Sequence, residues 1–171
     1  MGAGNVGALN AFKHVGKGAG IAVLLFDLAK GAGAVAIALW LLDVSPLFVL
    51  AAGLAAVVGH NWSIFLKFTG GKGMATTIGV LAVLMHHYGY WCGVLIFLAI
   101  VGIGMAITHN VALSNAIALI CLPIIVWLGT KSVPFVSFTV ILGLVVGLKT
   151  LPSARAAWAS SEGIRDFIRG R

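Results

Sequence analysis

Long apolar runs, rather than ten-residue segments of alternating hydrophobicity, dominate the chain. Six apolar stretches stand out, at about residues 19–42, 47–66, 74–87, 91–107, 111–128 and 133–148. At a rise of about 1.5 Å per residue, the first is long enough to cross a bilayer core of about 30 Å. The third, at 14 residues, is short for a span. The pattern predicts an all-α, polytopic integral membrane protein with about six transmembrane helices.

Composition excludes the main alternative, a soluble globular fold. Of the 171 residues, 61% are hydrophobic and 9% are charged, with a mean hydropathy of +1.12. A soluble domain carries about 25% charged residues. The length suits one transmembrane domain over residues 1–150, followed by a basic cytoplasmic tail over residues 151–171.

The positive charges predict the orientation of the helices. Eleven Lys and Arg against four Asp and Glu give a net charge of +7. If the N-terminal segment is cytoplasmic, six spans also place the C-terminus in the cytoplasm, and most cations then lie inside. Those cations are Lys13, Lys17, Lys67, Lys72, Lys149, Arg155, Arg165, Arg169 and Arg171. Topology therefore explains the charge. The positive charge also favours anionic lipids or phosphorylated substrates, and not nucleic acid, as partners.

The connection after the second stretch is the most informative polar segment. It contains Gly70, Gly71, Lys72 and Gly73, followed at once by a predicted helix that includes Thr76. Glycines free the backbone to turn its N–H groups toward a ligand, and a helix N-terminus attracts an anion. This pattern predicts a phosphate-binding loop, which we call the glycine loop (residues 70–73). The alternative is a tight turn with a cytoplasmic lysine. The spacing is not that of a nucleotide P-loop.

Other polar residues add candidates with open alternatives. Asp27 and Lys30 share one face of the first predicted span, where they either neutralise each other or contribute to a site. His60 ends the second span beside the glycine loop, either as a helix-end hydrogen-bonding group or as a catalyst. A third polar connection, residues 107–116, lies on the same predicted face of the membrane. No metal-ligand cluster is evident.

Three motifs in order resemble the acyl-phosphate:glycerol-3-phosphate acyltransferase family (PlsY) of bacterial membranes. The second is close to complete, with G-H at 59–60, F-L-K-F-T-G-G-K-G at 65–73 and M-A-T at 74–76. The first is recognisable as G-A-G-N-V-G-A-L-N-A-F-K at 2–13, with G-K-G-A-G at 16–20 and D-x-x-K-G at 27–31. The third is loosely present around residues 108–115.

The resemblance implies a bacterial inner-membrane enzyme that makes lysophosphatidic acid without a cofactor or metal. Its substrates would be acyl phosphate and the 1-hydroxyl of glycerol 3-phosphate, with bilayer lipids around it and no obligatory protein partner. The implied catalytic residues are Asn5, Lys13, His60 and Lys72. The implied substrate-binding residues are Asp27, Lys30, Gly70, Gly71, Gly73, Thr76, Ser114 and Asn115. The donor's own phosphate would accept the proton.

Departures from the family pattern leave two other functions open. The family usually has Ser at the positions of Ala3 and Ala112 and Arg at Lys13, and it begins with a further span before the first motif. We interpret that span as missing here, through reduction or a start codon assigned too late. The lost hydroxyls favour a non-catalytic relative that binds a phosphorylated ligand or lipid. A small transporter component is the third hypothesis.

Overall fold

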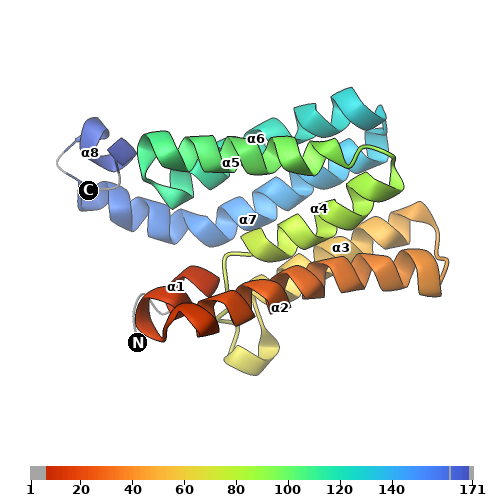
Figure 1. Ribbon diagram of the computed structural model, residues 1–171, viewed down its shortest axis with the longest axis horizontal. Helices are drawn as coiled ribbons and strands as arrows, with labels where there is room; N and C mark the ends of the chain where they lie inside the picture. The colour runs from red at the N-terminus through yellow and green to blue at the C-terminus, as the bar shows by residue number, and fades with distance from the viewer. Residues whose placement is uncertain (1–6, 162, 170–171) are drawn as a thin grey trace. The chain divides into compact units, whose positions relative to one another are not determined.

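The computed structural model describes residues 7–161 and 163–169, and every regular element in these ranges is helical. Figure 1 shows the helices in chain order. They are α1 (Ala8–His14), α2 (Lys17–Ala36), the π-helix η1 (Ile37–Leu41), α3 (Pro46–Asn61), the 3₁₀-helix η2 (Ile64–Leu66), α4 (Met74–His87), α5 (Cys92–Thr108), α6 (Val111–Thr130), α7 (Val133–Ala159) and α8 (Ile164–Arg169). The all-α prediction is confirmed.

Four of the six apolar stretches each match one helix, whereas the first covers α2 and η1 and the second covers α3 and η2. Four helical segments are long and apolar enough to cross a membrane: Lys17–Leu41, Pro46–Leu66, Val111–Thr130 and Val133–Ala159. The other two, Met74–His87 and Cys92–Thr108, are apolar but shorter, with 14 and 17 residues. The protein is therefore a multi-pass membrane protein. The largest boundary difference is in α7, which continues to Ala159 although the apolar stretch ends near residue 148.

The chain divides into two compact units, residues 1–87 and 88–171, and each is described by itself. In the first unit, α2 packs closely against α4 through one glycine on each helix. A Cβ on Gly31 of α2 would overlap the backbone carbonyl of Thr76, and a Cβ on Gly79 of α4 would overlap that of Leu28. Small residues allow such close backbone approach between membrane helices. This packing brings the middle of α2 to the start of α4.

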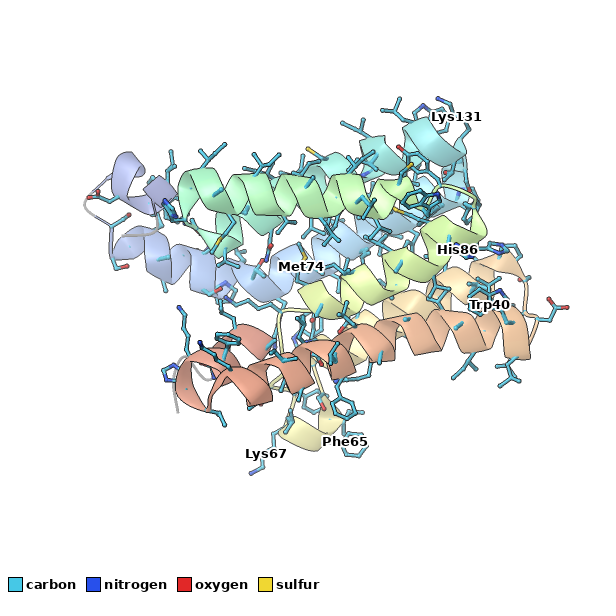
Figure 2. All side chains as sticks on the ribbon, viewed as in Figure 1. Trp40, Phe65, Lys67, Met74, His86 and Lys131 are labelled. Atoms are coloured by element: carbon cyan, nitrogen blue, oxygen red, sulfur yellow. The ribbon has the colours of Figure 1, made fainter. Side chains whose placement is uncertain are left out.

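Helix α3 completes the first unit and carries the connection that leads to α4. Its buried face repeats every four residues at Val49, Gly53, Val57 and Asn61, which lie on one side of a helix. The following connection projects from the helices with Phe65 and Lys67 at its tip, whereas Trp40 and His86 lie at the other end of the unit (Figure 2). The connection then returns to the C-terminal end of α3, where Gly73 lies against Asn61, so this end of α3 faces the start of α4.

In the second unit, α5 and α6 form a hairpin, α7 packs on α6, and α8 contacts α5. The turn between α5 and α6 is closed by side chains. Asn110 is the N-cap of α6, and its Oδ1 accepts hydrogen bonds of 3.1 Å from the N–H groups of Ala112 and Leu113. Its Nδ2 donates to the carbonyl of Phe167 in α8 at 2.7 Å. This residue therefore fixes both the start of α6 and the position of α8.

Candidate functional site

The glycine loop lies directly against the C-terminal end of α3. A Cβ on Gly70 would overlap the backbone carbonyl of His60, and a Cβ on Gly71 would overlap the His60 imidazole at Nε2. Gly73 has a φ of +76°, and a Cβ there would overlap Oδ1 of Asn61. Larger residues would lift the loop away from α3. The glycines thus allow a close fit between the loop and the helix.

Lys72 is the one residue of the loop with a side chain, and it is half-buried. Burial lowers the pKa of the Lys72 ammonium below its ordinary value, because desolvation disfavours the charged form. No ion pair joins it to a carboxylate of the described residues. Helix α4 begins two residues later, and the first N–H groups of a helix lack intrahelical partners. A partly desolvated cation beside a helix N-terminus suits an anion such as a phosphate group.

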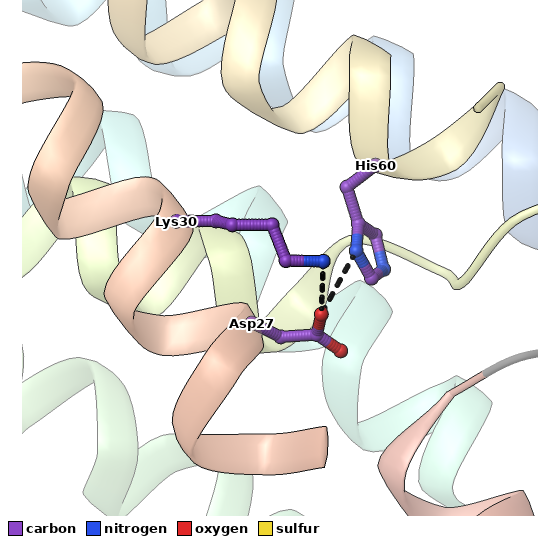
Figure 3. A network of polar contacts seen from close by, with 3 residues as sticks. All are labelled: Asp27, Lys30 and His60. Carbon is purple, nitrogen blue, oxygen red and sulfur yellow. Dashed lines mark ion pairs between the residues drawn. The ribbon is translucent and has the colours of Figure 1, made fainter. Parts of the chain in front are cut away.

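A polar network links α2 to the end of α3 (Figure 3). Oδ1 of Asp27 lies 2.8 Å from Nζ of Lys30 and 3.2 Å from Nδ1 of His60. The side chains of Asp27 and His60 are buried, whereas that of Lys30 is 56% exposed. The ion pair between Asp27 and Lys30 is thus present, and the His60 imidazole contacts the same carboxylate oxygen. The network joins residues that are 33 positions apart in the sequence.

The orientation of His60 connects this network to the glycine loop. Nδ1 faces the Asp27 carboxylate, which accepts a hydrogen bond, and Nε2 lies against Gly71. The imidazole therefore occupies the space between α2 and the loop, where its position is fixed from both sides. In this geometry His60 supports the backbone of the glycine loop, which carries Lys72. Its catalytic role stays a prediction.

The remaining predicted residues of the first unit lie in different surroundings. Asn5 lies outside the described residues. Lys13 is exposed near the end of α1, which packs on α2. Thr76 is completely buried in the first turn of α4. The structure thus places Asp27, His60, the glycine loop and Thr76 around one helix junction.

Ser114 and Asn115 belong to the second unit. The Ser114 hydroxyl is buried and donates to the carbonyl of Asn110 at 2.9 Å, with Oγ1 of Thr108 at 3.2 Å. The hydroxyl is therefore engaged within the turn, and a contact with substrate stays a prediction. Asn115 instead lines an apolar groove of about 350 Å³ between α6 and α7. Within the described ranges, no group of three or more His, Cys, Asp or Glu side chains is placed to hold a metal ion.

The candidate residues did not include Asn61, which the structure places directly under the glycine loop. Its side chain is completely buried, and neither of its amide atoms has a hydrogen-bond partner among the described residues. The signal was present in the sequence, because Asn61 continues the four-residue spacing of Val49, Gly53 and Val57. A polar residue at the end of such an apolar face is expected to point into the protein.

Comparisons with known proteins agree on one family. A family model described as glycerol-3-phosphate acyltransferase matches residues 1–159. Glycerol-3-phosphate acyltransferase 1 of Dehalococcoides mccartyi (strain ATCC BAA-2266 / KCTC 15142 / 195) is 48% identical over 149 residues, which are 87% of this chain and 72% of that protein. The glycerol-3-phosphate acyltransferase of Synechococcus sp. (strain JA-3-3Ab) is 37% identical over 150 residues, covering 85% of this chain and 68% of that protein.

Two solved structures share the fold. The crystal structure of PlsY (YgiH), an integral membrane glycerol 3-phosphate acyltransferase, in its glycerol 3-phosphate form, gives a TM-score of 0.83 at 24% identity and covers 95% of this chain and 79% of that chain. Its lysophosphatidic acid form gives a TM-score of 0.81 at 26% identity and covers 95% of this chain and 80% of that chain. The resemblance seen in the motifs therefore extends to the fold.

Proposed function

The chain belongs to the glycerol-3-phosphate acyltransferase family, and from this premise we propose that it acylates glycerol 3-phosphate with acyl phosphate as the donor. The product is lysophosphatidic acid, which serves phospholipid synthesis. As a multi-pass membrane protein with bacterial relatives, it acts in the bacterial inner membrane.

One observation carries the assignment of the acceptor site. Lys72 is a half-buried cation without a carboxylate partner among the described residues, in a loop of glycines that ends at a helix N-terminus. A phosphate monoester supplies the negative charge that pairs with the Lys72 ammonium. The loop backbone packs against His60 at Gly70 and Gly71, and this contact keeps Lys72 close to the start of α4.

The reaction needs positioning more than a strong base, because acyl phosphate is already an activated donor. The 1-hydroxyl oxygen attacks the acyl carbonyl carbon and forms the ester bond. The bond between that carbon and the bridging phosphate oxygen breaks, and inorganic phosphate leaves with the hydroxyl proton. Lys72 and the loop N–H groups hold the acceptor phosphate so that the hydroxyl reaches the carbonyl.

We propose that the acyl chain of the donor occupies the apolar groove of the second unit. The groove is lined by Asn115, Ala116, Leu119, Gly143, Leu144 and Gly147, among other residues. Small and aliphatic side chains of this kind suit a hydrocarbon chain, and Asn115 provides a polar group on the groove wall.

Filling the groove is expected to change donor preference. A Cβ on Gly143 would meet Leu119 at ordinary contact distances of 3.8–4.0 Å, and Gly143 lines the groove, so the side chain of Gly143→Leu is expected to reduce the volume of the groove. We expect kcat/KM for palmitoyl phosphate to fall about tenfold, and that for octanoyl phosphate to fall less. Gly102→Leu is the control, because a Cβ on Gly102 meets open space. Equal losses with both donors would contradict the assignment.

The pH dependence follows from Lys72. Its lowered pKa means that the free enzyme loses this proton at a lower pH than an exposed lysine would. Bound phosphate favours the ammonium form of Lys72, so binding takes up a proton when the pH is above the pKa of Lys72 in the free enzyme. The value of kcat/KM for glycerol 3-phosphate therefore falls as the pH rises through that pKa. Lys72→Arg keeps its charge and should move this alkaline limb upward. An alkaline limb at the same pH in the wild type and in Lys72→Arg would exclude Lys72 as the source of that limb.

Donor identity tests the proposed reaction. The purified protein is given glycerol 3-phosphate with either palmitoyl phosphate or palmitoyl-CoA, and lysophosphatidic acid and inorganic phosphate are quantified. We expect equal amounts of both products from palmitoyl phosphate and no product from palmitoyl-CoA. Product from the CoA ester alone would overturn the donor assignment.

A further inference from the structure

Asn61 is the last residue of α3, at the point where the glycine loop returns to meet the helix. Its side chain is completely buried, and its Oδ1 occupies the place where a side chain on Gly73 would begin. Val57, one turn earlier, is also within contact range of that position. The carboxamide thus points at the end of the loop, next to the start of α4.

The amide is unusual because neither polar atom is used. No described residue accepts from Nδ2 or donates to Oδ1. Burying an amide without partners is costly, and an apolar side chain of similar size would pack there at lower cost. A buried polar group without a partner in a native structure calls for an explanation, such as a functional role or a bound water or ion. The partner expected here is one that the chain itself does not provide.

The surroundings define the chemistry of that partner. Lys72 is a half-buried cation, and α4 presents its N-terminal N–H groups beside Gly73. Both features favour an anion, for which Nδ2 of Asn61 is an additional donor. The oxygen of the amide faces Gly73, and rotation of the amide by half a turn brings Nδ2 to the same place.

We propose that Asn61 is a specificity-determining residue of the acceptor site, whose Nδ2 donates to the phosphate of glycerol 3-phosphate. This inference rests on the proposed function. Because the Asn61 side chain is completely buried, the phosphate reaches it when residues 70–73 shift relative to α3, and three of those four residues are glycine. Asn61 then favours a phosphate monoester over uncharged glycerol, because a hydrogen bond to a charged oxygen is stronger than one to a hydroxyl.

Asn61→Leu tests the proposal, since leucine has nearly the same size and no polar atom. We expect KM for glycerol 3-phosphate to rise about tenfold to a hundredfold, with a much smaller change in kcat, because a hydrogen bond to a charged group is lost. The thermal unfolding temperature in detergent should stay the same or rise, because the variant removes an unpartnered buried amide. A merely structural asparagine would not raise KM while preserving stability.

A second variant and a control complete the test. Asn61→Asp keeps the shape but presents a carboxylate to the phosphate, so it should raise KM at least as much. Thr77→Val is the control, because it also removes an unpartnered buried polar atom, in the first turn of α4. Its KM should match that of the wild type. An equal rise for Thr77→Val would overturn the assignment to Asn61.

The outcomes separate this inference from the function on which it rests. Wild-type activity with an unchanged KM in both Asn61 variants would refute the role of Asn61 and leave the acyltransferase intact. A wild-type protein that forms no lysophosphatidic acid would refute the proposed function, and this inference with it.

Discussion

Lys72→Ala is expected to lower kcat/KM for glycerol 3-phosphate by about a hundredfold to a thousandfold. The variant leaves a bound phosphate dianion without its buried counter-charge, and removing one partner of such a pair costs about 3–5 kcal/mol. Half-burial of Lys72 places the expected loss toward the lower part of that range. Steady-state kinetics with palmitoyl phosphate in excess measure the change.

Lys67→Ala is the matched control, because it removes an exposed lysine from the same connection. Its activity should stay within about twofold of the wild type, since an exposed charge contributes little. Size-exclusion chromatography in detergent confirms that both variants are folded. Equal losses in the two variants would show that the general positive charge of the connection, and not the Lys72 site, supports activity.

Gly31→Ala is expected to cause the largest loss of stability. The added Cβ would overlap the backbone carbonyl of Thr76, and backbone cannot move aside as a flexible side chain can. Helices α2 and α4 must therefore separate, at a cost of about 1–3 kcal/mol. The thermal unfolding temperature should fall by roughly 3–10 °C. Activity should fall as well, because Thr76 belongs to the first turn of α4 beside the glycine loop.

Gly33→Ala, on the same helix α2, is expected to cause no loss of stability. A Cβ on Gly33 meets nothing within 4 Å, and alanine favours a helix over glycine by about 1 kcal/mol. This variant should therefore be as stable as the wild type or more so. If Gly31→Ala were equally stable, the close packing of α2 on α4 would be wrong.

Much of the fold was predictable because hydrophobic runs are a local property of the sequence. The stretch at residues 74–87 matches α4, and the one at 111–128 matches α6 to within two residues. The end of α7 was not predictable from hydropathy. The helix continues through Pro152 into a polar segment, beyond the point where apolar residues indicate a span.

The site was predictable where its residues are adjacent in sequence. Residues 70–73 and the start of α4 form one continuous pattern, so the loop could be recognised directly. The contact between Asp27 and His60 could not, because it depends on how α2, α3 and α4 pack. That packing is set by the close approaches at Gly31 and Gly79. The engagement of Ser114 likewise depends on the closed turn that Thr108 and Asn110 form.

The central claim is that this chain is an acyltransferase with glycerol 3-phosphate as its acceptor. The most direct measurement is the formation of lysophosphatidic acid by the purified protein from palmitoyl phosphate and isotopically labelled glycerol 3-phosphate. We predict labelled lysophosphatidic acid in amounts that rise with time and protein concentration. Folded protein that binds glycerol 3-phosphate but forms no labelled lipid would contradict the claim and support a non-catalytic relative.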